Sequence, residues 1–169
     1  MVTVWLGLGS NLGDSEAYIG QAVSLLGEFL TEGRLSGLWR SKARYVTDQP
    51  DFLNAVFSGR TELGPHDLLE AVHGVEAKLG RDRSAVVPKG ARTMDIDILL
   101  YGSSIIADDE LVVPHPGMRE RKFVLLPLLE LEPGLVDPVS NRSFRDFLAE
   151  LPPQGIYPAG PCIYDAVYP

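Results

Sequence analysis

The sequence lacks several features that would indicate particular classes of protein. Its single cysteine, Cys162, cannot form an internal disulfide and lies in a Pro/Gly-rich tail without metal-ligand spacing. No apolar run is long enough to cross a bilayer, and the start, MVTVWLGLGSNLG, has neither a basic n-region nor a long apolar h-region. Internal repeats and low-complexity blocks are also missing. We therefore expect a cytoplasmic protein that does not associate with membranes.

The glycines near the start match neither of two common nucleotide-binding loops. Gly7-x-Gly9 is followed by Gly13, one position late for the G-x-G-x-x-G fingerprint of dinucleotide-binding proteins. The Gly-Lys-Ser/Thr of a Walker loop is missing as well. The sequence thus argues against both of these designs for binding a nucleotide.

Positive charge is scarce but clustered. Fifteen Lys+Arg against 23 Asp+Glu give a net charge of −8, which argues against sequence-independent binding of nucleic acid or anionic membranes. The basic residues nevertheless form two groups, one of Arg81, Arg83, Lys89 and Arg92, the other of Arg119, Arg121 and Lys122. Such runs are often only solvated faces. Here they suggest a small anionic ligand.

Length and patterning predict one domain over residues 1–169, with a core from 1 to 151 and a surface tail from 152 to 169. The expected elements are strands at 2–8, 34–41, 52–61 and 94–101, and helices at 14–29, 64–80, 123–131 and 144–151. The first hundred residues therefore have the order β-α-β-β-α-β. This order predicts an α+β fold with a ferredoxin-like core, an antiparallel sheet with helices packed on it.

The predicted strand in GARTMDIDILLYG, residues 90 to 102, carries two aspartates. Side chains alternate across a strand, so Asp95, Asp97 and Leu99 are expected on one face, with Ile96, Ile98 and Leu100 on the other. The two carboxylates would then stand about 6 to 7 Å apart. Their repulsion, about 2.5 kcal/mol at an effective dielectric of 20, would be reversed by a divalent cation. The alternative is an edge strand whose polar face lies in water.

The connection at 81–92 directly precedes this strand and has no clear periodicity. Loops of this length inside compact domains are usually functional lids or disordered segments, and the four cations in this one favour a lid. Cations for an anion beside carboxylates for a metal are the combination that a metal–polyphosphate site requires.

Four segments together resemble one enzyme family, the 6-hydroxymethyl-7,8-dihydropterin pyrophosphokinases of folate biosynthesis. They are GLGSNLGD, DQPDFLNAV, GARTMDIDILLYG and VPHPGMRERKFVLLPLLEL, in the family's order and covering the chain to about residue 138. The resemblance implies a ferredoxin-like fold and a reaction in which ATP donates its terminal two phosphates to the pterin's hydroxymethyl oxygen, releasing AMP. The substrates would be ATP and the hydroxymethyl-dihydropterin, and we expect a monomer that binds no nucleic acid.

The resemblance also assigns roles to individual residues. Asp95 and Asp97 match ligands for one or two Mg²⁺ ions, and Arg81 and Arg92 match catalytic arginines that clamp the triphosphate. Residues assigned to ATP are His73, Glu76, Arg83, Ile98, His115 and Arg121. Residues assigned to the pterin are Phe52, Asn54, Phe123 and Tyr45. Asp97 is also a candidate general base, although the metal alone could suffice.

Other interpretations stay open at this point. His73 and Glu76 could be ordinary helix surface, and Phe52 and Phe123 could be core packing. The stretch SKARYVT, residues 41 to 47, has neither the proline nor the glycine of the family's usual Thr-Pro-x-x-Gly-like loop, so a different acceptor is conceivable. A non-catalytic ferredoxin-like module that binds RNA is the third alternative, but no aromatic–basic stacking motif is visible.

Overall fold

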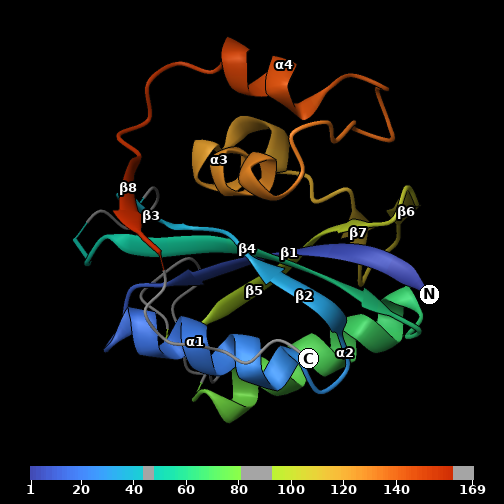
Figure 1. The fold of residues 1–169 in the computed structure, drawn as a ribbon, viewed down its shortest axis with the longest axis horizontal. Helices are drawn as coiled ribbons and strands as arrows, with labels where there is room; N and C mark the ends of the chain where they lie inside the picture. Colours follow the sequence, from blue (N-terminus) through green and yellow to red (C-terminus); the bar gives the residue numbers. More distant parts are fainter. Residues whose placement is uncertain (44–47, 81–92, 162–169) are drawn as a thin grey trace.

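The computed structural model describes residues 1–43, 48–80 and 93–161, and its centre is an antiparallel sheet (Figure 1). The sheet strands are β1 (Val2–Ser10), β2 (Thr31–Leu35), β3 (Leu38–Ser41), β4 (Phe52–Thr61), β5 (Asp95–Tyr101) and β8 (Tyr157–Gly160). The helices are α1 (Ser15–Leu26), α2 (Pro65–Lys78), α3 (Lys122–Leu131) and α4 (Phe144–Glu150). A small hairpin, β6 (Ile106–Ala107) and β7 (Val112–Val113), and a 3₁₀ turn, η1 (Met118–Glu120), connect β5 to α3.

The strand order is β5-β1-β4-β3-β8, with β2 also paired to β4, and every pairing is antiparallel. Counted as four units, with β2 and β3 together as the second, this is the order 4-1-3-2 that two interleaved β-α-β units produce. The predicted α+β fold with a ferredoxin-like core is confirmed.

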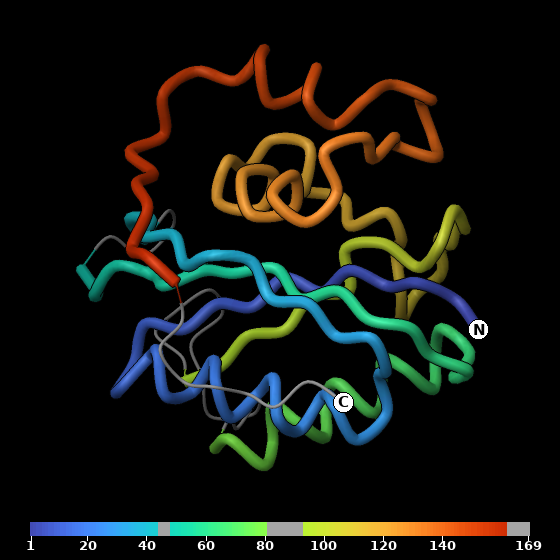
Figure 2. Tube along the Cα trace, viewed as in Figure 1, coloured from blue at the N-terminus to red at the C-terminus, as the bar shows by residue number. Residues whose placement is uncertain are grey.

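Helices cover both faces of the sheet (Figures 1 and 2). One core lies between the sheet and the pair α1 and α2, and it includes Leu6, Phe57, Ile96 and Ile98. A second core joins Trp5 and its neighbours on the opposite face to α3, with α4 lying over α3. Because both faces of the sheet are covered by hydrophobic cores, polar side chains on these faces are exceptions that suggest a functional role.

Local sequence explains where the first two helices begin and end. The Asp14 carboxylate accepts a hydrogen bond from the Ala17 N–H at 3.1 Å and caps α1. Pro65 occupies the first turn of α2, where its missing N–H costs nothing, and Gly80 follows Leu79 with a φ of +87° that favours glycine. Both predicted helices are confirmed, although α1 ends at Leu26, before residue 29.

Three features differ from the prediction. The strand expected at 34–41 is interrupted, because the Ser36 hydroxyl accepts a hydrogen bond from the Val56 N–H at 2.9 Å in place of a backbone carbonyl. The tail was expected to run over the surface without secondary structure, but its exposed residues Tyr157–Gly160 form β8, which pairs with β3. The hairpin of β6 and β7 was not expected from the sequence either.

A β-bulge in β5 changes which side chains share a face. Leu6 of β1 pairs with Ile98, but the next residue, Trp5, pairs with Leu100, so Leu99 is an extra residue. Both Leu99 and Leu100 therefore pack into the core beneath α3. The prediction that Leu100 would share a face with Ile98 was wrong. The bulge arises from the pairing of β5 with β1, and the residue pattern of β5 alone does not indicate it.

Among the residues that the structure describes, no helix has the length and apolar character needed to span a membrane.

Candidate active site

Asp95 and Asp97 lie on the face of β5 that α3 covers. They alternate with Ile96 and Ile98, which are buried in the core on the α1/α2 side. Both carboxylates are half-buried, and Asp97 Oδ2 lies 3.8 Å from His115 Nε2. The prediction that the two acids face the same way is confirmed. β5 is the edge strand of the sheet among the described residues, as the alternative interpretation supposed, and the Asp97 side chain is 42% exposed.

His115 lies beside the acid pair and is held in one orientation. Its backbone N–H donates to the Leu99 carbonyl at 2.9 Å, and its Nδ1 accepts from the Gly117 N–H at 3.2 Å. Burial of the ring and the positive charge of Arg121 lower the pKa of His115 to about 4, although Asp95 acts in the opposite direction. The ring is therefore neutral at pH 7, and its proton is on Nε2, the nitrogen nearest Asp97.

Arg121 brings a positive charge to the same region. A Cβ placed on Gly117 would lie 2.7 Å from the Arg121 guanidinium carbon, so the side chain passes over a glycine that leaves it room. The guanidinium lies 5.8 Å from the ring centroid of Phe123, at a distance typical of a cation–π contact. Two acids, a neutral imidazole and a guanidinium thus gather where β5 faces the start of α3.

Two glycines of β1, Gly7 and Gly9, lie beside the acids, and we call them the glycine floor. The Leu99 side chain packs over Gly7, where an added Cβ would lie 3.4 Å from Leu99 Cδ2. Gly9 pairs with Asp95 on one side and with Asn54 of β4 on the other, and Gly7 pairs with Asp97. A Cβ on Gly9 would lie 3.6 Å from Asn54 Oδ1 and 3.8 Å from Phe52 Cδ1. Since neighbouring strands are about 4.8 Å apart, the backbones that carry Asp95 and Asn54 are separated by about 10 Å, and the residue paired with both, Gly9, has no side chain.

Asn54 is held by its neighbours in a way that leaves its oxygen available. Its Nδ2 donates to Ser41 Oγ at 2.8 Å and to the Trp39 carbonyl at 3.1 Å. Because a backbone carbonyl can only accept, these contacts identify the amide nitrogen and point Oδ1 toward the glycine floor. The sequence interpretation assigned Asn54 to the pterin, and the structure leaves the amide oxygen of Asn54 free as an acceptor among the described residues.

Glu76 is not a surface residue. It is 1% exposed, and its Oε2 accepts a hydrogen bond from the Ile96 N–H at 3.1 Å, on the outer edge of β5. This contact holds the acid-bearing strand from the α2 side, with the half-buried His73 one turn earlier. The Ile98 side chain is 4% exposed and belongs to the α1/α2-side core, so only its backbone could contact a ligand on the opposite face.

The two predicted aromatics have different surroundings. Phe52 is half-buried at the start of β4, beside the position that a Gly9 side chain would take. Phe123 is also half-buried and packs against the core beneath α3, so the packing interpretation is partly right for it. Tyr45, Arg81, Arg83 and Arg92 lie outside the described residues, and their assigned roles stay predictions.

The donor set fits magnesium carried by a nucleotide better than a closed metal centre. Within residues 1–43, 48–80 and 93–161, no group of three or more His, Cys, Asp or Glu side chains is arranged to hold a metal by itself. Mg²⁺ typically uses one or two carboxylates and completes its octahedron with water and phosphate oxygens. Asp95 and Asp97 supply that number of carboxylates.

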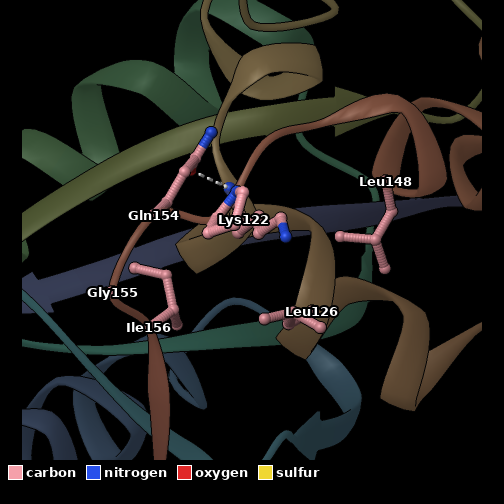
Figure 3. Close-up of a pocket in the computed structure, with 7 residues that line it drawn as sticks. Lys122, Leu126, Leu148, Gln154, Gly155 and Ile156 are labelled. Carbon is pink, nitrogen blue, oxygen red and sulfur yellow. Dashed lines mark hydrogen bonds between the residues drawn. The ribbon is translucent and has the colours of Figure 1, made fainter.

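A pocket of about 330 Å³ lies elsewhere, between α3, α4 and residues 153–156 (Figure 3). It is lined by Lys122, Leu126, Leu148, Pro153, Gln154, Gly155 and Ile156. None of the residues assigned to ATP, metal or pterin is among them, and no carboxylate or imidazole lines it. We do not identify this pocket with the reaction centre.

Sequence reasoning missed two contributors to the site, the glycine floor and Ser41. Gly7 and Gly9 were considered in a nucleotide fingerprint that they fail to match and in the family segment GLGSNLGD, but not as part of a binding surface. Their spacing of two within a strand places both on one face, and this pattern could have predicted two neighbouring positions without side chains on that face. Ser41 offered no such pattern, because its contact with Asn54 depends on how β3 and β4 pair.

Comparison with known proteins identifies the family. The model of the 7,8-dihydro-6-hydroxymethylpterin-pyrophosphokinase (HPPK) family matches residues 5–133. The chain belongs to this family. The Methylorubrum extorquens 2-amino-4-hydroxy-6-hydroxymethyldihydropteridine pyrophosphokinase is 43% identical over 160 residues, 92% of this chain and 98% of the relative. The Aquifex aeolicus enzyme of the same name is 41% identical over 150 residues, 89% and 92% of the two chains. The chain is thus a pyrophosphokinase of folate biosynthesis, and the predicted family and enzyme class are confirmed.

Longer relatives contain a comparable unit as one part. The chain spans 21% of the Schizosaccharomyces pombe folic acid synthesis protein fol1, with 39% identity over 156 residues and 90% of this chain covered. A solved structure of Plasmodium falciparum HPPK-DHPS superposes with a TM-score of 0.72 over 88% of this chain and 45% of that chain. At 14% identity, this last match supports the fold alone.

Proposed function

We propose that Asp95 and Asp97 hold Mg²⁺ with the phosphates of ATP, and that the glycine floor and Asn54 receive 6-hydroxymethyl-7,8-dihydropterin. The hydroxymethyl oxygen attacks the β-phosphorus of ATP, the bond to the oxygen that bridges the α- and β-phosphates breaks, and AMP leaves. The observation that carries this proposal is the row Asp95, Gly9 and Asn54, paired across three strands. In this row Asp95 and Asn54 lie on either side of a residue without a side chain, which supports a metal and a heterocycle bound side by side on this face.

When bound to the two carboxylates, Mg²⁺ would neutralise charge on the phosphates and make the β-phosphorus easier to attack. The chain's own residues have complementary tasks. Asp95 and Asp97 fix the position of the nucleotide's polyphosphate relative to the sheet, which supplies the alignment on which such transfers depend. Because the two acids are anchored on a strand buried in the core on its other face, that alignment is rigid.

His115 and Arg121 stabilise the negative charge that develops on the phosphate oxygens during the transfer. The neutral His115 donates through Nε2, so it can hold a phosphate oxygen or orient Asp97 without adding a proton to the reaction. Arg121 supplies a guanidinium at the same position. Arg81 and Arg92 would complete the clamp on the triphosphate. The hydroxyl proton of the acceptor passes to Asp97 or to water.

Asn54 offers its carbonyl oxygen to an N–H donor on the edge of the pterin, and Phe52 and Phe123 supply apolar surface for the flat ring. Assignment of Tyr45 to the pterin, and of His73, Glu76, Arg83 and the Ile98 backbone to ATP, belongs to the same proposal. A monomeric state and a cytoplasmic location remain predictions from the sequence.

The direct test is product formation by the purified protein with ATP, Mg²⁺ and the hydroxymethyl-dihydropterin. We expect AMP and the pterin diphosphate in equal amounts, with both lost when EDTA removes the metal. A folded protein that binds Mg²⁺–ATP but releases no AMP would contradict the proposal. AMP formation with another hydroxymethyl heterocycle, and none with the pterin, would transfer the assignment to a different acceptor.

A further inference from the structure

Helix α3 begins without a cap of its own. Among the described residues, Arg121 at the N-cap position makes no side-chain hydrogen bond to the first turn. The Lys122 N–H instead donates to Gln154 Oε1 at 2.9 Å, as the dashed line in Figure 3 marks. Gln154 Nε2 donates to the Glu120 carbonyl, also at 2.9 Å. A residue 32 positions from Lys122 thus caps the first N–H of α3 with its amide oxygen and holds the end of η1 with its amide nitrogen.

The two hydrogen bonds enclose a residue of the site. Glu120 and Lys122 are the neighbours of Arg121, which has an extended backbone between η1 and α3. Phe123 follows Lys122, and its ring makes a cation–π contact with the Arg121 guanidinium. Any shift of this junction therefore moves both Arg121 and Phe123. Gln154 itself touches neither of them through a recorded hydrogen bond, so its effect on the site is indirect.

The same segment also contacts the opposite side of the floor. We call residues 154–160 the strap. Its strand β8 pairs with β3, where Tyr157 lies opposite Arg40. The Tyr157 hydroxyl donates to Asp51 Oδ2 at 3.4 Å, directly before Phe52. The strap is therefore hydrogen-bonded close to Phe123 through Gln154 and close to Phe52 through Tyr157. Figure 1 shows its path from α4 to β8.

We propose that Gln154 is a positioning residue for the pterin side of the site, and that the strap fixes the distance between its two aromatic walls. This inference rests on the proposed function. The family match ends at residue 133, so it assigns no role to the strap. The altered SKARYVT stretch begins at the last residue of β3, and β8 of the strap pairs with β3. The strap therefore supports β3 from its outer edge.

The test compares the steady-state constants of Gln154→Ala with those of the wild type, well below the melting temperature. Because Arg121 and Phe123 would shift without this cap, we expect KM for the pterin to rise about fivefold while kcat changes less than about twofold. Gln154→Glu keeps the acceptor for the Lys122 N–H but cannot donate to the Glu120 carbonyl. We expect it to restore part of the loss, because a carboxylate also suits a helix N-terminus.

Arg142→Ala is the matched control in the same layer. It removes the contact of Arg142 with Glu150 and with the Phe147 ring on α4, without touching the start of α3. We expect a lower melting temperature with wild-type KM values. A pterin KM in Gln154→Ala equal to that of the wild type, or an equal rise in Arg142→Ala, would overturn the inference.

Two further readouts separate this inference from the proposed function. If the wild type forms no AMP, the proposed function fails, whatever the variants do. If the wild type is active, the affinity for the pterin tests the role of Gln154 independently of turnover. It is measured by fluorescence titration in the presence of an unreactive ATP analogue. A Gln154→Ala affinity about fivefold weaker supports the strap, and an unchanged affinity contradicts it. Should Gln154→Ala not fold, Gln154→Glu carries the same comparison.

Discussion

At the scale of single residues, the site combines charge with absent side chains. Asp95 and Asp97 could be placed on one face from the sequence, because strand alternation needs no knowledge of neighbours. The bulge at Leu99 and the tautomer of His115 could not be predicted, since they depend on the register with β1 and on the Gly117 N–H. Asn54 was identified, but its freed oxygen depends on Ser41 and Trp39.

Gly9→Ala tests the glycine floor directly. The new Cβ would lie at ordinary contact distances from Asn54 Oδ1 and Phe52 Cδ1, 3.6 and 3.8 Å, so the fold accepts it. It would nevertheless occupy part of the space that we propose for the pterin. We expect a melting temperature close to that of the wild type and a rise of about tenfold in the pterin KM, the equivalent of about 1.4 kcal/mol, in a steady-state assay.

Gly33→Ala provides the contrast, because its Cβ would lie 2.6 Å from Phe57 Cζ, away from the acid pair. It should lower the melting temperature and leave KM unchanged. If Gly9→Ala binds the pterin as the wild type does, the ligand does not lie on this floor.

At the scale of elements, the helices could be predicted from their own residues, whereas the limits of several strands depend on the strands with which they pair. The start of α1 at Asp14 and the two ends of α2 at Pro65 and Gly80 could be predicted from the sequence, whereas the end of α1 could not. The split between β2 and β3 depends on Ser36 and its partner strand, and β8 exists only because β3 has a free edge. Such pairings over long sequence separations leave no periodic pattern.

The loop after α3 is anchored by a buried ion pair that positions η1, directly before Arg121. Asp137 is 0% exposed and accepts two hydrogen bonds from Arg119, at 2.9 and 2.7 Å. Burial alone raises the pKa of this carboxyl. The hydrogen bonds from Arg119, Ser140 and the Val139 N–H outweigh burial and lower its pKa from 3.8 to about 2.

Asp137→Asn should destabilise the fold by about 3 kcal/mol at pH 7, because it leaves Arg119 without its charged partner. The native carboxyl has a lower pKa than the unfolded one, so its contribution is complete above pH 4 and is lost as the pH falls from about 4 to about 2. Chemical denaturation at several pH values should therefore show the difference between wild type and variant shrinking over that window. A difference that stays constant down to pH 2 would contradict the assignment.

At the scale of the whole molecule, one sheet with a core on each face holds the site on rigid elements. The α1/α2-side core fixes the acid-bearing strand from behind, while α3 brings Arg121 and Phe123 over the opposite face. The order of elements allowed this architecture to be predicted, since a β-α-β-β-α-β chain has few ways to bury its sheet. The placement of α4 and the strap over α3 could not be predicted, because nothing in their own patterns specifies which surface they cover.

The central claim is that Asp95 and Asp97 hold the metal that carries the nucleotide. Binding of Mn²⁺ as a magnesium substitute, followed by electron paramagnetic resonance with an unreactive ATP analogue, tests it most directly. We predict that the wild type binds Mn²⁺ together with the analogue, and that Asp95→Asn and Asp97→Asn each weaken this binding at least about tenfold while remaining folded. Binding of Mn²⁺ and analogue at wild-type affinity in both variants would contradict the account.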